Sequence, residues 1–471
     1  DIDSNFGVLA GGTLAAAGAV RITANRDVTF GSVSGGANVN IALTGNSDLT
    51  ADRISSGTNV RATLQGGVFV ADSVSAAKTG QGSDFIRAGD GIDLRNVSGN
   101  RATLQAFNGL LNVRNNVDVT DILLADGAAV SVVTQQDMTV SSVANSGDLF
   151  LSSAGNLDVQ GARATGDIRI SVGGSVTIND TFVAGQSAPA GFTGPQNTVS
   201  TGGDIVVNAI EGVRINSLLS AANALQITAG GLIDIQAEVL ANRITTVSSD
   251  MTIGSLGGLG QTGLTSDIRI FSDGTTQMIV GEASDLTGVF YLDNDEFSRI
   301  HSGGDLTITA VATGLGGYDM LVRDLGVRVA DTVAGPQSAN IGSGNALNLV
   351  SGQSIAVTGL VDFRNGNANS GLNFTAGEDL FINAAGGVIQ MSDTAGSFTG
   401  SGSLSISAAN VYAMTSQALA DIVDLSAADI DIRLANNDGI DLPDGLIRAD
   451  NVRIAVTDNL LIQNTAEGTD F

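Results

Sequence analysis

The most chemically dense stretch of the chain surrounds its only histidine, His301. Three carboxylates, Asp293, Asp295 and Glu296, precede this histidine closely, and Arg299 lies between them and it. Carboxylate oxygens are the ligands that Ca²⁺ prefers, and carboxylates beside a histidine could also form an acid/base cleft. The alternative is a solvated insertion loop with an incidental histidine. We favour that alternative, because a short motif without structural context is weak evidence.

Two further segments carry paired aspartates in the same pattern, Asp90-Gly-Ile-Asp93 and Asp438-Gly-Ile-Asp441. Such pairs could be the two carboxylates of a glycan-cleaving enzyme or ligands of a cation. We interpret them as Asp-Gly corners that lead into strands, since both residue types tolerate tight turns. We therefore expect no catalytic residues and no cofactor, with Ca²⁺ at Asp293, Asp295 and Glu296 as the single metal hypothesis. The absence of Trp, with only three Tyr, argues against a long sugar-binding groove.

The composition narrows the range of partners. The formal net charge of the 471 residues is −27, which opposes binding to nucleic acid and to anionic lipid surfaces. Cysteine is absent, which suits a protein that crosses a membrane unfolded, because no premature disulfide can form. No apolar run approaches the roughly 18 residues that a membrane-spanning helix needs, so we expect no membrane span.

These residues must be positioned by a repeated unit of about 19 to 20 residues. Val130, Leu149 and Ile168 begin equivalent segments of the pattern apolar-x-apolar, and a second such segment and a shorter third one follow each of them. Alternation over short runs predicts strands with one buried face, and the Gly, Asn and Asp between the runs suit tight corners. Helical spacing is absent.

Three short strands and three corners in about 20 residues describe one coil of a parallel β-helix, an all-β solenoid. Successive coils would lie about 4.8 Å apart, with equivalent residues stacked in ladders. Val132 is expected on Leu151, and Leu151 on Ile170. The sequence predicts about 20 coils, forming a rod roughly 100 Å long at that spacing.

The repeat extends over residues 1–471 without a composition shift, so we expect one continuous solenoid. Insertions are expected near 184–203, 254–266 and 285–303, where the period lengthens. The last unit lacks an evident polar cap, and solenoids need such caps for solubility. We therefore expect the chain to be a segment of something longer or a subunit that stacks end to end. Further predicted strand segments are Val20–Ile22, Val28–Phe30, Ala62–Leu64, Val68–Val70, Leu225–Ile227, Ile233–Ile235, Leu306–Ile308, Leu347–Leu349, Ile355–Val357, Leu372–Phe374, Leu380–Ile382, Leu404–Ile406, Val452–Ile454 and Leu460–Ile462.

Several units read Gly-Asp-Leu-Thr-Ile-Thr-Ala or close to it, as in Gly304–Ala310, Gly203–Ala209 and Ala224–Gly231. This string resembles the repeat of filamentous haemagglutinin-like exoproteins, the β-helical products of two-partner secretion. The resemblance runs over most of the chain. It implies a right-handed parallel β-helix, export through an outer-membrane barrel of a Gram-negative cell, and a secreted or cell-surface location. No binding residue can be carried over from that family.

Three functions fit these observations. The leading hypothesis is a structural or adhesive fibre segment that contacts other cells, surfaces or glycans, for example in biofilm, and is not an enzyme. The second is a self-assembling filament or surface-layer subunit, and the third is a β-helical polysaccharide lyase or hydrolase. In the third, the carboxylates around His301 would do the chemistry.

Overall fold

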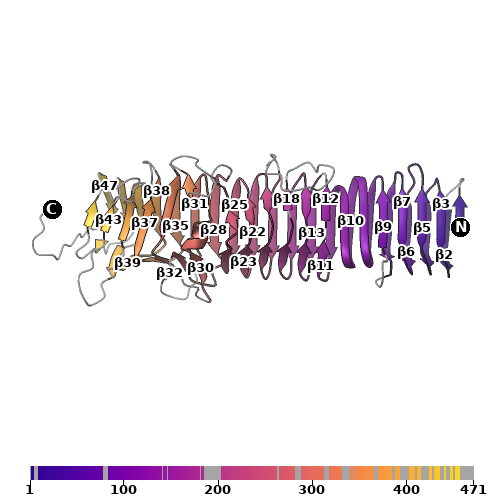
Figure 1. Ribbon diagram of the computed structural model, residues 1–471, viewed down its shortest axis with the longest axis horizontal. Coiled ribbons are helices and arrows are strands. Elements are labelled where there is room, and N and C mark those ends of the chain that lie inside the picture. The colour runs from indigo at the N-terminus through magenta and orange to yellow at the C-terminus, as the bar shows by residue number, and fades with distance from the viewer. Residues whose placement is uncertain are drawn as a thin grey trace, which may run out of the picture. The chain divides into compact units, whose positions relative to one another are not determined.

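The computed structural model places most of the chain in strands and divides it into two compact units, Asp1–Leu225 and Gln226–Phe471. Each unit is a stack of parallel strands, and within each unit neighbouring strands lie side by side in Figure 1. The structure describes residues 2–4, 9–77, 83–140, 142–145, 147–180, 182–184, 203–261, 265–281, 288–311, 318–330, 340–342, 344–364, 370–383, 388–392, 403–408, 411–414, 424–426, 429–434, 440–441, 446–448 and 451–456.

Each coil in the most regular part of the first unit contains three short strands, as the repeat predicts. Strands of one coil pair in parallel with the equivalent strands of the next, and buried and outward side chains alternate along them. The expected ladder is confirmed, because Val132 pairs with Leu151 and Leu151 with Ile170. The six strands of two successive coils are β13 (Leu149–Ser153), β14 (Leu157–Val159), β15 (Ala162–Ala164), β16 (Ile168–Val172), β17 (Val176–Ile178) and β18 (Phe182–Ala184).

The first coils of this unit use fewer and longer strands. In β4 (Val28–Gly35), Phe30 and Val33 are both buried with two less buried residues between them, so the strand bends and two of its segments face the core. In the same way β10 (Gly91–Thr134) continues through corners as a single strand. The other strands here are β1 (Ile2–Ser4), β2 (Leu9–Ala16), β3 (Val20–Ala24), β5 (Val39–Leu43), β6 (Leu49–Ser56), β7 (Val60–Leu64), β8 (Val68–Ser75), β9 (Ser83–Ala88), β11 (Met138–Val140), β12 (Ser142–Asn145), β19 (Ile205–Ala209), β20 (Val213–Ile215) and β21 (Leu219–Ala221).

Aspartates at the corners hold neighbouring coils of this unit in register. The Asp167 N–H donates to Asp148 Oδ1 at 2.9 Å, 19 residues earlier, and the Asp204 N–H donates in turn to Asp167 Oδ1 at 3.0 Å. Asn179 continues a second ladder, since its Oδ1 accepts from Asn216 Nδ2 at 2.8 Å. These aspartates therefore satisfy backbone groups at bends, where strand pairing ends.

The second unit has three faces of parallel strands but longer coils. The Ala346 N–H donates to Asp305 Oδ1 across 41 residues, about twice the predicted period. Its strands are β23 (Leu232–Ile235), β24 (Glu238–Leu240), β25 (Arg243–Ser248), β26 (Asp250–Ile253), β27 (Gly258–Leu259), β28 (Asp267–Ser272), β29 (Met278–Gly281), β30 (Phe290–Asp293), β31 (Asp305–Ala310), β32 (Tyr318–Arg323), β33 (Gly326–Ala330), β34 (Ile341–Gly342), β35 (Ala346–Ser351), β36 (Ser354–Thr358), β37 (Leu360–Arg364), β38 (Gly371–Ala376), β39 (Leu380–Asn383), β40 (Val388–Ser392), β41 (Ser403–Ala408), β42 (Val411–Met414), β43 (Asp424–Ser426), β44 (Asp429–Leu434), β45 (Ile440–Asp441), β46 (Leu446–Arg448) and β47 (Asn451–Val456).

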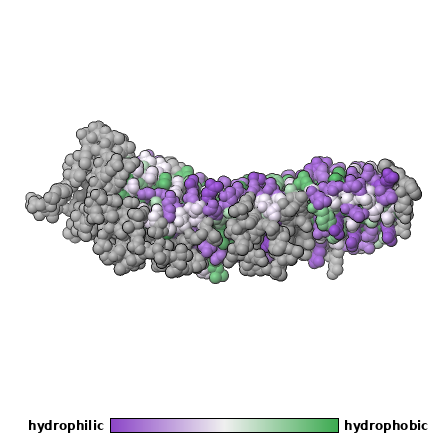
Figure 2. All heavy atoms as spheres, turned by 90° about the horizontal axis from the view of Figure 1, so that it is seen from above, coloured by the Kyte–Doolittle hydropathy of each residue, from purple (hydrophilic) through white to green (hydrophobic). Residues whose placement is uncertain are grey.

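The all-β parallel β-helix is thus confirmed. All of the predicted strand segments that fall within the described residues lie in strands of the structure. The remaining one, Leu460–Ile462, lies outside the described residues. In the described part of the chain no helix is long and apolar enough to cross a membrane. On the face drawn in Figure 2, hydrophilic residues cover much of the described surface.

Candidate functional site

The acidic stretch before His301 is part of the packed solenoid wall, as far as its described residues 288–303 show. β30 pairs in parallel with β29, which precedes it in the chain, and Phe290 and Leu292 are fully buried. The helix α1 (Asn294–Phe297) follows directly and buries Phe297. The favoured interpretation as a solvated insertion loop is therefore wrong for these residues, because their apolar side chains supply a local core.

Glu296 uses both carboxylate oxygens on backbone groups. Its Oε1 accepts from the Ile253 N–H at 3.0 Å, and its Oε2 accepts from the Asp293 N–H at 3.2 Å. Asp293 returns the second contact, since its Oδ1 accepts from the Glu296 N–H at 2.7 Å, so the pair forms a capping box. Burial raises the pKa of Glu296 to about 7, against the opposing effect of the two backbone donors.

Arg299 and His301 also serve this packing. Arg299 Nη1 donates to the Ile253 carbonyl at 2.6 Å, and the backbone of Leu259 bonds both to Arg299 and to His301. His301 is 5 % exposed, so its side chain lies in the wall and not on an open surface. The contacts of Glu296 and Arg299 thus tie α1 to the strand that ends at Ile253, whereas the backbone of His301 bonds to β27.

The three residues of the calcium hypothesis are not arranged as a set. Asp293 and Glu296 point oxygens at backbone donors, and Asp295 is exposed. Within the described residues no group of three or more Asp, Glu or His side chains could hold a metal ion. The calcium hypothesis stays a prediction.

The Asp90-Gly-Ile-Asp93 pair behaves as the corner interpretation expects. Asp90 lies at a bend and its Oδ2 accepts from the Gly67 N–H at 3.0 Å. Asp93 lies in β10 and forms a 2.9 Å ion pair with Arg114. Of the second pair, Asp438 lies outside the described residues and Asp441 ends β45.

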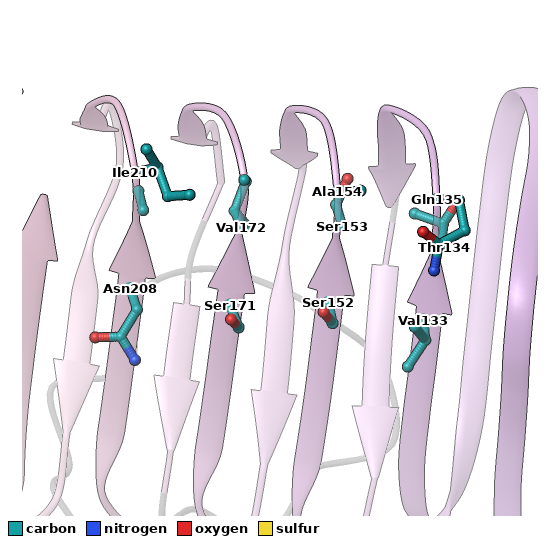
Figure 3. A pocket seen from close by; sticks show the side chains of 12 residues that line it. Val133, Thr134, Gln135, Ser152, Ser153, Ala154, Ser171, Val172, Asn208 and Ile210 are labelled. Carbon is teal, nitrogen blue, oxygen red and sulfur yellow. The ribbon is translucent and has the colours of Figure 1, made fainter. Parts of the chain in front are cut away.

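A shallow groove of about 370 Å³ crosses four coils of the first unit where their strands end (Figure 3). Its floor carries Val133, Ser152, Ser171 and Asn208, which are stacked in register. Ile210 stands at its edge with 72 % of its surface exposed. The groove offers hydroxyl and amide groups, and none of its lining residues is ionisable.

The first coils present a different surface, which we call the arginine face. It consists of ten outward positions in two rows, which begin at Arg21 and Thr23 of β3 and continue in parallel register over β5, β7, β9 and residues 101–106 of β10. Three of the ten are arginine and none is acidic, although the whole chain carries −27. The ten residues are Arg21, Thr23, Asn40, Ala42, Arg61, Thr63, Phe85, Arg87, Thr103 and Gln105.

The arginine face contains a trough and two stacked cation–aromatic pairs. The trough has a volume of about 360 Å³ and is lined by Arg21 and Arg61, with Asn40 and Ala42 between them. The Arg61 guanidinium lies 5.0 Å from the centre of the Phe85 ring, and that of Arg87 lies 4.2 Å from the Phe107 ring. The geometry can receive a planar anion flanked by apolar surface.

Sequence reasoning missed this face. Arg21, Arg61 and Arg87 are far apart in the chain, and only the strand register brings them onto one surface. A usable signal was present, since all three alternate with buried apolar residues. No protein-family model, no curated protein and no solved structure matches the chain.

Proposed function

We propose that this chain is a structural and adhesive segment of an extracellular fibre at the surface of a Gram-negative cell. The observation that carries the proposal is the continuity of the in-register ladders. Val132, Leu151, Ile170 and Val207 stack from coil to coil without a break. Each coil offers a template to the next, so added sequence becomes added reach.

The same ladders suit export of an unfolded chain. Stacking free energy gained outside the cell would favour outward passage through an outer-membrane barrel without ATP, and the absence of cysteine suits such a route. The repeat string shared with filamentous haemagglutinin-like exoproteins supports the same assignment. The outward positions remain available for contact with other cells, surfaces or glycans.

Electron microscopy and an attachment assay test the proposal together. The purified chain should appear as single elongated particles, and beads coated with it should attach to cells or to cell-surface glycans more than beads coated with albumin. Filaments that grow with concentration would favour the filament-subunit alternative. Globular particles, together with bead attachment no greater than that of the albumin-coated beads, would refute the proposal.

The enzyme alternative has its own assay. A panel of polysaccharides incubated with the chain should release no sugar fragments under the fibre proposal. Turnover that disappears in Asp295→Ala would replace the fibre proposal with a lyase or hydrolase.

A further inference from the structure

We infer that the arginine face binds the carboxylate groups of an extended acidic polysaccharide built of uronic acids. This inference deepens the adhesive function proposed above by naming a ligand class, and it rests on that function for its biological setting. The binding itself is a property of the first unit and can be measured alone.

Arg21, Arg61 and Arg87 form no ion pair with a carboxylate among the described residues. Elsewhere, Arg114, Arg169 and Arg269 form 2.9 Å ion pairs with Asp93, Asp167 and Asp267. Arg21, Arg61 and Arg87 are exposed, and none of the ten positions of the arginine face holds a carboxylate. A cluster of unpaired guanidinium groups on a chain of net charge −27 leaves a local positive surface that a carboxylate can neutralise.

The spacing of Arg21 and Arg61 suits a polymer. They occupy the same outward position on strands separated by one strand, so their backbones lie about 9.6 Å apart at the usual strand spacing. An extended polysaccharide in which alternate sugars face the same way presents carboxylates at a comparable repeat. Asn40 and Ala42 are short, which leaves the trough open for the intervening sugar.

The aromatic contacts orient the charged groups. A guanidinium that lies on an aromatic ring keeps its N–H edge free for two parallel bonds to a carboxylate. Arg61 on Phe85 and Arg87 on Phe107 have this arrangement, and Phe107 is 48 % exposed. Exposed ring surface can also cover the apolar C–H face of a sugar. The hydroxyl groups of Thr23 and Thr63 lie on the same face and can bond to sugar hydroxyls.

A uronic acid polymer fits this face better than a nucleic acid does. Duplex DNA carries a charge every 1.7 Å or so, and the −27 net charge of the chain repels so dense a polyanion strongly. A uronic acid polymer brings at most one carboxylate per sugar, which three arginines can match. The five strands of the face span only about 19 Å at the usual strand spacing, so the site accepts a short run of sugars. A short site also agrees with the absence of Trp.

Binding of polygalacturonate to the full chain tests the inference by biolayer interferometry at low and at physiological salt. We expect saturable binding that weakens with salt, and affinity for oligogalacturonates that rises with length and levels off once the oligomer spans the face. The triple variant Arg21→Gln, Arg61→Gln, Arg87→Gln should lose at least about tenfold in affinity. The matched control Arg169→Gln, Arg269→Gln removes two exposed arginines that are already paired and should bind as the unaltered chain does.

Further measurements of unfolding and of binding decide whether the inference holds. Circular dichroism should give both variants the unfolding midpoint of the unaltered chain, and Arg61→Lys, which keeps the charge but loses the planar fork, should bind more weakly. Equal loss of binding in the control pair, equal or tighter binding of duplex DNA, binding of uncharged dextran, or full binding by Arg61→Lys would each overturn the inference. Failure of polygalacturonate to bind while coated beads still attach to cells would refute this ligand and leave the adhesive function standing.

Discussion

The backbone N–H of Ile253 donates a 3.0 Å hydrogen bond to Oε1 of Glu296, 43 residues further along the chain. This bond joins the strand that ends at Ile253 to the helix α1 of a later turn. Glu296 also accepts from Asp293, so one carboxylate satisfies two backbone donors that strand pairing leaves open. One of the three candidate calcium ligands is thus a structural connection between α1 and the strand that ends at Ile253.

Glu296 gives the fold a pH dependence. Burial raises its pKa to about 7 from an ordinary value of 4.5, so the folded state favours the protonated acid more than the unfolded state does. Its contribution to stability is therefore greatest below pH 4.5 and declines as the pH rises to 7. In Glu296→Gln we expect this part of the decline to disappear, in urea unfolding followed from pH 4 to pH 8.

Glu296→Gln should also lower the free energy of unfolding by a route that does not depend on pH. Its amide cannot accept from both Ile253 and Asp293, so we expect it to be less stable at pH 4 by about 1 kcal/mol. The exposed neighbour provides the control, because Asp295→Asn should leave the pH profile unchanged. A profile of Glu296→Gln as steep as that of the unaltered chain would show that Glu296 does not titrate in this range.

Calcium provides a separate test of the same residues. An ion held by Asp293, Asp295 and Glu296 would compete with the backbone donors that now occupy two of these carboxylates. We therefore expect Ca²⁺ at about 1 mM to leave the midpoint of thermal unfolding within about 1 °C of its value without metal, since a ligand stabilises only a fold that binds it. A larger rise that is lost in Asp295→Asn would establish the calcium site.

Asp84 supplies a second pH effect, in the first unit. It occupies a buried position in line with Val60 and Ala102, and it is 1 % exposed. Neither of its oxygens has a hydrogen-bond partner among the described residues, and the nearby Ala76 N–H donates to the Ser98 carbonyl. Burial raises the pKa of Asp84 to about 8. The fold therefore holds this residue as a neutral acid below that pH.

The raised pKa of Asp84 means that the folded state loses stability as the pH rises. The stability that depends on protonated Asp84 is fully present below pH 3.8 and is lost progressively as the pH rises to about 8. Asp84→Asn should remove that slope and stabilise the chain at pH 8 by a few kcal/mol, measured by denaturant unfolding at fixed salt. The exposed Asp72→Asn serves as the control. Equal slopes in Asp84→Asn and in the unaltered chain would contradict the assignment.

The fold could be predicted because its core repeats at a fixed interval. Val132, Leu151 and Ile170 recur at one spacing since each coil must place the same buried position over the last. The Glu296 region could not be predicted in this way. Its partner Ile253 is 43 residues away, and a contact that occurs once leaves no period in the sequence. The arginine face is a similar case, because register decides which outward residues become neighbours.

Gly281 is a backbone position that only glycine fits. Its φ is +117°, and a Cβ there would lie 1.7 Å from the Arg323 carbonyl oxygen of the neighbouring strand β32. Gly281→Ala should therefore destabilise the second unit by at least about 2 kcal/mol, through both the disfavoured φ and the clash. The matched control is Gly326→Ala, where a Cβ meets no atom within 4 Å. Chemical denaturation of both variants compares them, and equal stability would refute the steric argument.

Ile170 tests whether stability spreads through the ladder or stays local. It is 1 % exposed and is stacked between Leu151 and Val207, so Ile170→Ala leaves a cavity in the core and should cost about 2–5 kcal/mol. The neighbouring Ser171 faces the groove, and Ser171→Ala should change stability by no more than about 0.5 kcal/mol. In a solenoid each coil contacts only its neighbours, so amide exchange in Ile170→Ala should quicken most in β13, β16 and β19 and least in β3 and β5. Equal acceleration throughout the first unit would instead show that its coils unfold as a single cooperative block.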